Sequence, residues 1–186
     1  MASLRPPDAP PDRSPEAREL CDALRQELSD EWIVVLRPLP GLPREDRLQL
    51  TGWALVGPPG VLWLAHGFRF RWEAGGWWFA GHGARDVVAG ARGAEDRVRS
   101  VVGPHARTLG GGDVVLGHGV LLTAGGLPAD APGDRFVAWS PEPDGESLAA
   151  FVDRLAARGR VARRVERPPF TPAEVERLAA LLDPGP

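Results

Sequence analysis

The chain has 186 residues, a formal net charge of −3 and a hydrophobic content of 43%. These values predict one soluble globular domain with a real core, and they argue against a dedicated nucleic-acid binder, which usually carries a basic excess. No apolar run approaches the ~18 residues of a membrane span, and the N-terminus has no apolar signal core, so we expect a cytoplasmic protein without a membrane partner.

Two residue types are nearly or wholly absent. Cys21 is the single cysteine, which excludes a disulfide framework and a cysteine metal site. The sequence has no lysine, and all 22 of its basic Lys or Arg residues are arginine. The chain therefore cannot use a mechanism that needs the compact, titratable ammonium group of a lysine.

The N-terminal part of the chain predicts a tail, a helix and a strand. Residues 1–13 are rich in proline and are expected to form a disordered or extended tail before a domain that spans residues 14–186. Ser14 is a suitable N-cap and Pro15 a suitable first residue for an amphipathic helix, Ser14–Leu28. Trp32–Leu36 is predicted to be the first strand.

The stretch from Leu48 to Ala80 organises the predicted fold. Turns at Gly57-Pro58-Pro59-Gly60 and Ala74-Gly75-Gly76, with a weaker break at His66-Gly67, divide it into short runs rich in β-branched and aromatic residues, typical of a β-meander. The runs are Leu48–Val56, Val61–Ala65, Phe68–Glu73 and Trp77–Ala80. Because Val61–Leu64 is apolar on both faces, we predict a central strand covered on both sides.

Beyond Ala80 the pattern predicts a loop, a helix and a strand. Gly81-His82-Gly83 is expected to be a loop. Apolar residues at helical spacing predict a helix over Asp86–Val102, which Gly103-Pro104 should end. Val114–Leu116 and Val120–Leu122 are expected to form one interrupted or bulged strand.

The C-terminal part predicts one short strand and two helices. Arg135–Trp139 is the expected strand. Asp144 can cap a helix that ends at Gly159, and Thr171 with Glu174 forms a capping box for the last helix. The whole order of elements predicts a single α/β domain with a mixed, largely antiparallel central sheet flanked by helices.

Several of these segments resemble one known family. They are the Ala54–Leu64 pair of runs around its Gly-Pro-Pro-Gly turn, the Gly-Phe-Arg-Phe-Arg and Gly-Gly-Trp-Trp-Phe strands, Arg97–Val102 and the Thr171–Leu182 ending. Over roughly residues 14–183 the chain resembles the nuclease-related domain (NERD) proteins. The resemblance implies a fold similar to that of the PD-(D/E)XK, or restriction-endonuclease-like, nucleases.

The resemblance also implies where a nuclease site would lie. In such nucleases two acidic residues hold a divalent metal, and a lysine helps to activate water. Those positions fall on Gly52, Ala65 and Gly67. A helical glutamine of the family falls near Ala94, and an early glutamate falls near Glu16 or Ala17. Because glycine and alanine offer no side-chain oxygen, we expect no catalytic residue, no metal and no cofactor here.

Three functions stay open at this point. The favoured one is a catalytically inactive NERD-like domain that acts as a binding or regulatory module for a protein or nucleic-acid partner. The alternative is a metal-dependent nuclease or hydrolase with a relocated site. Its residues would be drawn from Asp46, Glu73, His66, His82 and Asp86. The third is a stand-alone structural domain whose partner is encoded nearby.

Other candidate sites have simpler interpretations. His66, His82 and His118 each precede a glycine and could bind a transition metal with Glu73 or Asp86, but their spacing matches no compact ligand motif, so solvated loop histidines are favoured. The arginine run Arg158–Arg167 could contact phosphate, and a solvated connector is favoured.

Overall fold

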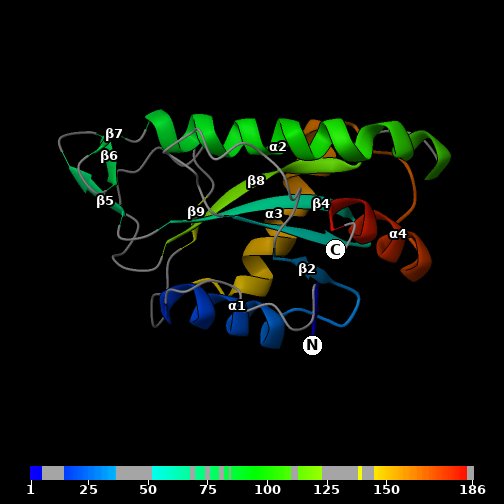
Figure 1. The fold of residues 1–186 in the computed structure, drawn as a ribbon, viewed down its shortest axis with the longest axis horizontal. Helices are drawn as coiled ribbons and strands as arrows, with labels where there is room; N and C mark the ends of the chain where they lie inside the picture. Colours follow the sequence, from blue (N-terminus) through cyan, green and yellow to red (C-terminus); the bar gives the residue numbers. More distant parts are fainter. Residues whose placement is uncertain are drawn as a thin grey trace.

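The computed structural model describes residues 1–5, 15–36, 52–67, 70–73, 76–79, 82–83, 85–109, 113–122, 138–139 and 145–183. These residues form a six-stranded sheet, a separate three-stranded sheet and four α-helices (Figure 1). Among them, no helix is both long and apolar enough to cross a membrane.

The main sheet has the spatial order β1-β2-β3-β4-β8-β9. Its strands are β1 (Ser3–Arg5), β2 (Ile33–Val35), β3 (Gly52–Gly57), β4 (Gly60–Gly67), β8 (Val115–Leu122) and β9 (Ala138–Trp139). The small sheet contains β5 (Phe70–Glu73), β6 (Gly76–Phe79) and β7 (His82–Gly83). The helices are α1 (Pro15–Glu27), α2 (Arg85–Ala106), α3 (Leu148–Ala162) and α4 (Pro172–Leu182), with a 3₁₀ turn at Arg107–Leu109.

The α/β class and the mixed central sheet are confirmed. In the main sheet, β2, β3 and β4 pair antiparallel, whereas β1 pairs with β2, β4 with β8 and β8 with β9 in parallel. The small sheet is antiparallel throughout. The main sheet is therefore mixed, with an antiparallel centre from β2 to β4 and parallel pairings on both sides of it.

Helices cover both faces of the main sheet. Helices α1 and α3 pack on one face, where Leu62 and Leu64 of β4 point, and α2 and α4 pack on the other, where Val61 and Trp63 point. Figure 1 shows α2 above the sheet and α1 below it. The prediction that Val61–Leu64 is a central strand buried on both faces is confirmed, since β4 lies between β3 and β8.

Two predictions about strands need correction. Residues Ser3–Arg5 do not belong to a tail, because they form β1 and pair in parallel with Ile33–Val35; residues 6–13 lie outside the described part of the chain. The meander is also not one sheet. After β4 the chain leaves the main sheet, and β5, β6 and β7 hydrogen-bond with one another at one end of the molecule (Figure 1).

Several predicted breaks do not occur, and at His66 and Gly159 burial outweighs the local signal. His66-Gly67 ends no strand, because β4 continues through both residues, and His82-Gly83 is a strand rather than a loop. Helix α2 runs through Gly103-Pro104 to Ala106, and α3 runs through Gly159 to Ala162. Ser147 caps α3, while the predicted cap Asp144 lies outside the described residues.

Other local predictions are confirmed. The register between β4 and β8 shifts between Val61 and Leu62, which is the expected bulge, and it leaves Leu116 without a pairing partner. At the start of α4 the Glu174 carboxylate accepts hydrogen bonds from the backbone N–H and the hydroxyl of Thr171, each at 2.8 Å. Phe170 and Val175, on either side of this cap, are buried in the same core.

Candidate functional site

The structure brings two of the family positions together. Gly52 of β3 and Ala65 of β4 are direct cross-strand partners. Residues paired in this way have side chains on the same face of a sheet, so an aspartate and a glutamate at these two positions would be neighbours. The backbone thus has an arrangement suited to two metal-binding carboxylates, but neither residue has a side-chain oxygen.

The indole of Trp63 fills the space beside Gly52. A Cβ atom added at Gly52 would lie 2.4 Å from Cζ2 and 2.7 Å from Cε2 of Trp63. The Leu64 carbonyl oxygen would also lie 2.8 Å from that Cβ atom, so a side chain at position 52 needs both the Trp63 indole and the β4 backbone to shift. The indole Nε1–H of Trp63 is buried and finds no hydrogen-bond acceptor within the part of the chain that the structure describes, which is an unfavourable state for a polar group. This position is therefore closed by packing as well as lacking ligands.

The remaining family positions do not complete a site. Gly67 pairs with Leu122 at the far end of β4, and Ala94 lies on α2, packed against the core beneath that helix. Glu16 is half-buried and Ala17 is buried, and both belong to α1, which packs on the sheet face opposite Trp63. No carboxylate from α1 can therefore reach Gly52 and Ala65 without crossing the sheet.

The histidine-centred alternative is not assembled among the described residues. His66 is buried and packs against Trp53 with ring centroids 4.2 Å apart, so the expectation of a solvated loop histidine is wrong for this residue. Trp53 belongs to the core of the α1 and α3 face, which separates His66 from the Gly52–Ala65 face. Asp46 and the side chains of Glu73, His82 and Asp86 lie outside what the structure describes.

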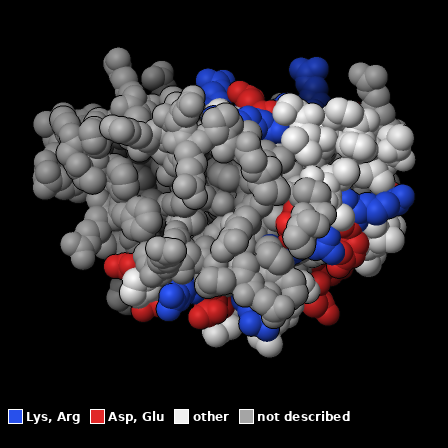
Figure 2. All heavy atoms as spheres, viewed as in Figure 1, with Lys and Arg blue, Asp and Glu red and all other residues white. Residues whose placement is uncertain are grey.

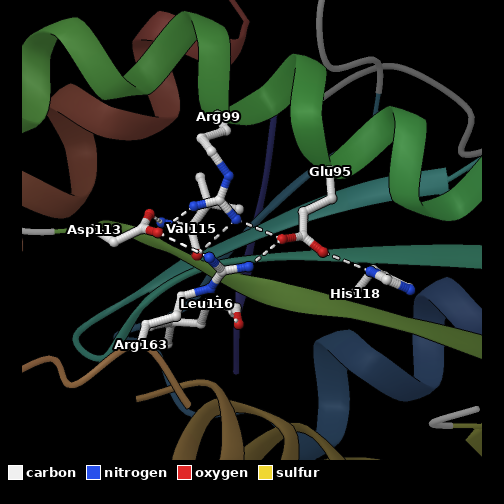
Figure 3. Close-up of polar contacts among 7 residues, drawn as sticks. All are labelled: Glu95, Arg99, Asp113, Val115, Leu116, His118 and Arg163. Atoms are coloured by element: carbon white, nitrogen blue, oxygen red, sulfur yellow. Dashed lines mark hydrogen bonds and ion pairs between the residues drawn. The ribbon is translucent and has the colours of Figure 1, made fainter. Parts of the chain in front are cut away.

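A charged cluster that the sequence did not predict joins α2, β8 and α3 (Figure 3). Glu95 is its centre, with a side chain only 7% exposed. Its Oε1 accepts hydrogen bonds from Arg99 and Arg163, both at 2.5 Å, and its Oε2 lies 2.5 Å from Nδ1 of His118. Asp113 pairs with the same two arginines, at 2.9 Å from Arg163 Nη1. We call these five residues the Glu95 network.

The negative charges of the Glu95 network are balanced by positive charges within it. Burial alone would raise the pKa of the Glu95 carboxyl, but its hydrogen bond and charge interaction with His118, and its contacts with Arg99 and Arg163, hold that pKa below its ordinary value. The two carboxylates face two guanidinium groups, so the network is neutral apart from His118. A buried charge needs partners of this kind, which explains why Glu95 can remain ionised.

The Glu95 network also closes an open sheet edge. Strand β9 pairs only with Val120 and Leu121 of β8, so on the side away from β4 the bulged start of β8 has no strand among the described residues. Arg163, which caps α3 on one face, reaches around this edge to Glu95 on the other face and donates through Nε to the Leu116 carbonyl at 3.2 Å. Unpaired edges invite aggregation, and a charged side chain across the edge is a common protection.

Chemically, the Glu95–His118 pair is a carboxylate-oriented imidazole. Such a carboxylate fixes which ring nitrogen carries the proton, and the second nitrogen is then available as a base or a ligand. In Figure 3 the second ring nitrogen of His118 points away from the Glu95 network. The described part of the chain holds no group of three His, Cys, Asp or Glu residues that could bind a metal.

The sequence contained weak signals for this network. Glu95 and Arg99 have the i, i+4 spacing of a helical ion pair, and Asp113 follows a glycine cluster. Nothing in the sequence indicated that Arg163, fifty residues after Asp113, would reach the same carboxylates. For His118 the sequence favours a solvated loop histidine over a metal ligand, and that expectation is wrong, because His118 lies in β8 and contacts Glu95.

The arginine run is only in part a solvated connector: Arg158 and Arg164 are exposed, whereas the other three arginines are part-buried. Arg160 Nη2 and Arg167 Nη2 donate to the carbonyls of Arg167 and Pro59 at 2.8 and 3.1 Å, and the Arg167 guanidinium lies 3.3 Å from the centroid of the Phe170 ring. Burial, with the nearby charge of Arg160, lowers the pKa of Arg167 to about 10. The Phe170 N–H donates to the Pro58 carbonyl at 2.8 Å. The run therefore fastens the α3–α4 connection onto the Pro58-Pro59 turn.

Comparisons with known proteins give no family for the chain. No family model matches it, and neither a curated protein nor a solved structure does.

Proposed function

We propose that this chain is a catalytically inactive, NERD-like domain that works as a binding or regulatory module. One observation carries the proposal: the cross-strand pair that would hold a nuclease metal consists of Gly52 and Ala65, and Trp63 occupies the space beside it. A hard divalent cation needs several oxygen ligands, and metal assistance supplies several kcal/mol of transition-state stabilisation. Without these ligands a nuclease of this type would have no measurable turnover.

The enzyme alternative has less support. It requires His66 to reach a shared site with Glu73, His82 or Asp86, or with Asp46. His66 instead packs against Trp53 in the core under α1 and α3. Glu73 and His82 belong to β5 and β7, which both pair with β6 and not with each other.

The experiment is a nuclease assay with single-stranded and double-stranded DNA and RNA, in the presence of Mg²⁺ or Mn²⁺. We expect no cleavage and no binding of Mn²⁺ by the purified protein. Cleavage that needs the metal and disappears in Glu73→Gln or His66→Ala would overturn the proposal and favour the relocated site. Cleavage that both variants retain at full strength would instead identify a contaminating nuclease.

A second set of variants tests the structural reason. Gly52→Asp, Ala65→Glu and Gly67→Lys restore the ligands and the lysine of the family, but Trp63 would still exclude the new aspartate. We expect this triple variant to bind no Mn²⁺, whereas adding Trp63→Leu removes the side-chain obstacle, leaves only a small shift of the β4 backbone at Leu64, and should create measurable binding. Tight Mn²⁺ binding by the triple variant with Trp63 in place would show that packing does not close the position.

A further inference from the structure

A small pocket opens between the start of β2 and the first turn of α4. Ile33, Phe170 and Val175 form its apolar floor, and all three are buried. Its volume is about 90 Å³. That is room for several water molecules at ~10–15 Å³ each, but it is well below the ~300 Å³ of a small cofactor site. The pocket therefore fits the end of one side chain.

Three carboxylates stand at the rim of this pocket. Asp30, Glu31 and Glu176 line it, and all three are exposed. Arg5 reaches the same rim, with Nη2 at 2.9 Å from Oε2 of Glu176. Asp30 and Glu31 form no ion pair with any residue that the structure describes. In Figure 2, acidic side chains gather at the lower right, where Figure 1 places α4 and the loop between α1 and β2.

We propose that this pocket receives one basic side chain, arginine or lysine, from a partner protein. The side chain would lie across the mouth of the pocket, with its methylene stem over the apolar floor and its charged head turned back to the carboxylates of Asp30 and Glu31 at the rim. The inference rests on the proposed function, because it names the partner chemistry of a binding module. Nucleic acid is the disfavoured partner, since its phosphate backbone would meet the carboxylates of Asp30 and Glu31, while the charge of Arg5 is already balanced by Glu176. An uncharged apolar side chain would desolvate Asp30 and Glu31 without replacing their hydrogen bonds to water.

The probe is N-acetyl-arginine amide, with the citrulline analogue as its uncharged match. Each is titrated into isotopically labelled full-length protein, and amide chemical shifts are recorded. We expect saturable shifts at Ile33, Val175 and Glu176 with the arginine probe. The citrulline probe should bind at least tenfold more weakly than the arginine probe. Added salt should lower the affinity of the arginine probe for the protein.

Variants test whether the carboxylates at the rim of the pocket bind the arginine probe. The double variant Asp30→Asn, Glu31→Gln should weaken the arginine probe at least tenfold. Asp153→Asn, which neutralises an exposed carboxylate on α3, is the matched control and should leave the binding unchanged. The proposal is overturned if citrulline or N-acetyl-leucine amide binds as well as arginine, if the double variant binds normally, or if no probe shifts these amides. The results of the nuclease and Mn²⁺ assays do not depend on any of these outcomes. The proposal of an inactive nuclease-like domain and the proposal of a pocket for a basic side chain can therefore fail separately.

Discussion

Gly159 provides the sharpest test of the packing between α3 and β8. A Cβ atom at this position would lie 2.4 Å from the carbonyl oxygen and 2.7 Å from the Cβ of Leu116. Helix propensity alone predicts that Gly159→Ala stabilises α3 by about 1 kcal/mol. Overpacking a tight contact costs about 1–3 kcal/mol, and the upper end applies because the obstacle is strand backbone that also accepts the Arg163 hydrogen bond. We therefore expect a net loss of about 2 kcal/mol.

Gly93 is the matched control for that test. It also lies inside a helix, α2, but a Cβ atom there would have nothing within 4 Å. Gly93→Ala should therefore raise the free energy of unfolding by about 1 kcal/mol, the difference in helix propensity between alanine and glycine. Urea denaturation followed by circular dichroism measures both variants against the parent protein. If Gly159→Ala were as stable as Gly93→Ala, the close approach of α3 to β8 would be refuted.

Two further predictions concern buried ionisable groups. Glu95→Gln should destabilise the protein by about 2 kcal/mol at pH 7, below the ~3–5 kcal/mol of a fully buried broken pair, because Asp113 still pairs with both arginines. The pKa of Glu95 is lower in the folded protein than its ordinary value of 4.5. The Glu95 carboxylate therefore makes its full contribution to the free energy of unfolding above pH 4.5 and loses that contribution as the pH falls further. The stabilities of the parent protein and the variant should converge in acid. Equal urea midpoints at pH 7, or a gap that widens in acid, would contradict this. Burial raises the pKa of the Cys21 thiol to about 11, so a thiol reagent at pH 8 should label it only after unfolding. Rapid stoichiometric labelling of the native protein would contradict that burial.

The sequence predicted elements well where one local signal dominated. The doubly apolar Val61–Leu64 run, the capping box at Thr171 and the bulge within β8 all follow from residues close together in the chain. Gly159 misled the prediction because a glycine that ends a helix and a glycine that allows a strand to approach look the same in sequence. The difference depends on Leu116, which is distant in the chain.

The candidate site was only half predictable for the same reason. The absence of carboxylates at Gly52 and Ala65 could be read directly, and their pairing follows from the turn between β3 and β4. The position of the Trp63 indole over Gly52 and the convergence of Arg163 on Glu95 require the packed structure. Charge pairs across a sheet edge leave no periodic pattern in a sequence.

The parallel pairing of β4 with β8 has a consequence for how this protein can diverge. It makes the segment between them a crossover, in which α2 is the returning helix and the small sheet is an insertion ahead of it. The three strands of that insertion hydrogen-bond with one another and belong to a different sheet from the core strands. Residues 70–83 can therefore lengthen, shorten or exchange their side chains while the order and direction of the core strands stay the same. The insertion is where new specificity can arise at little cost to folding.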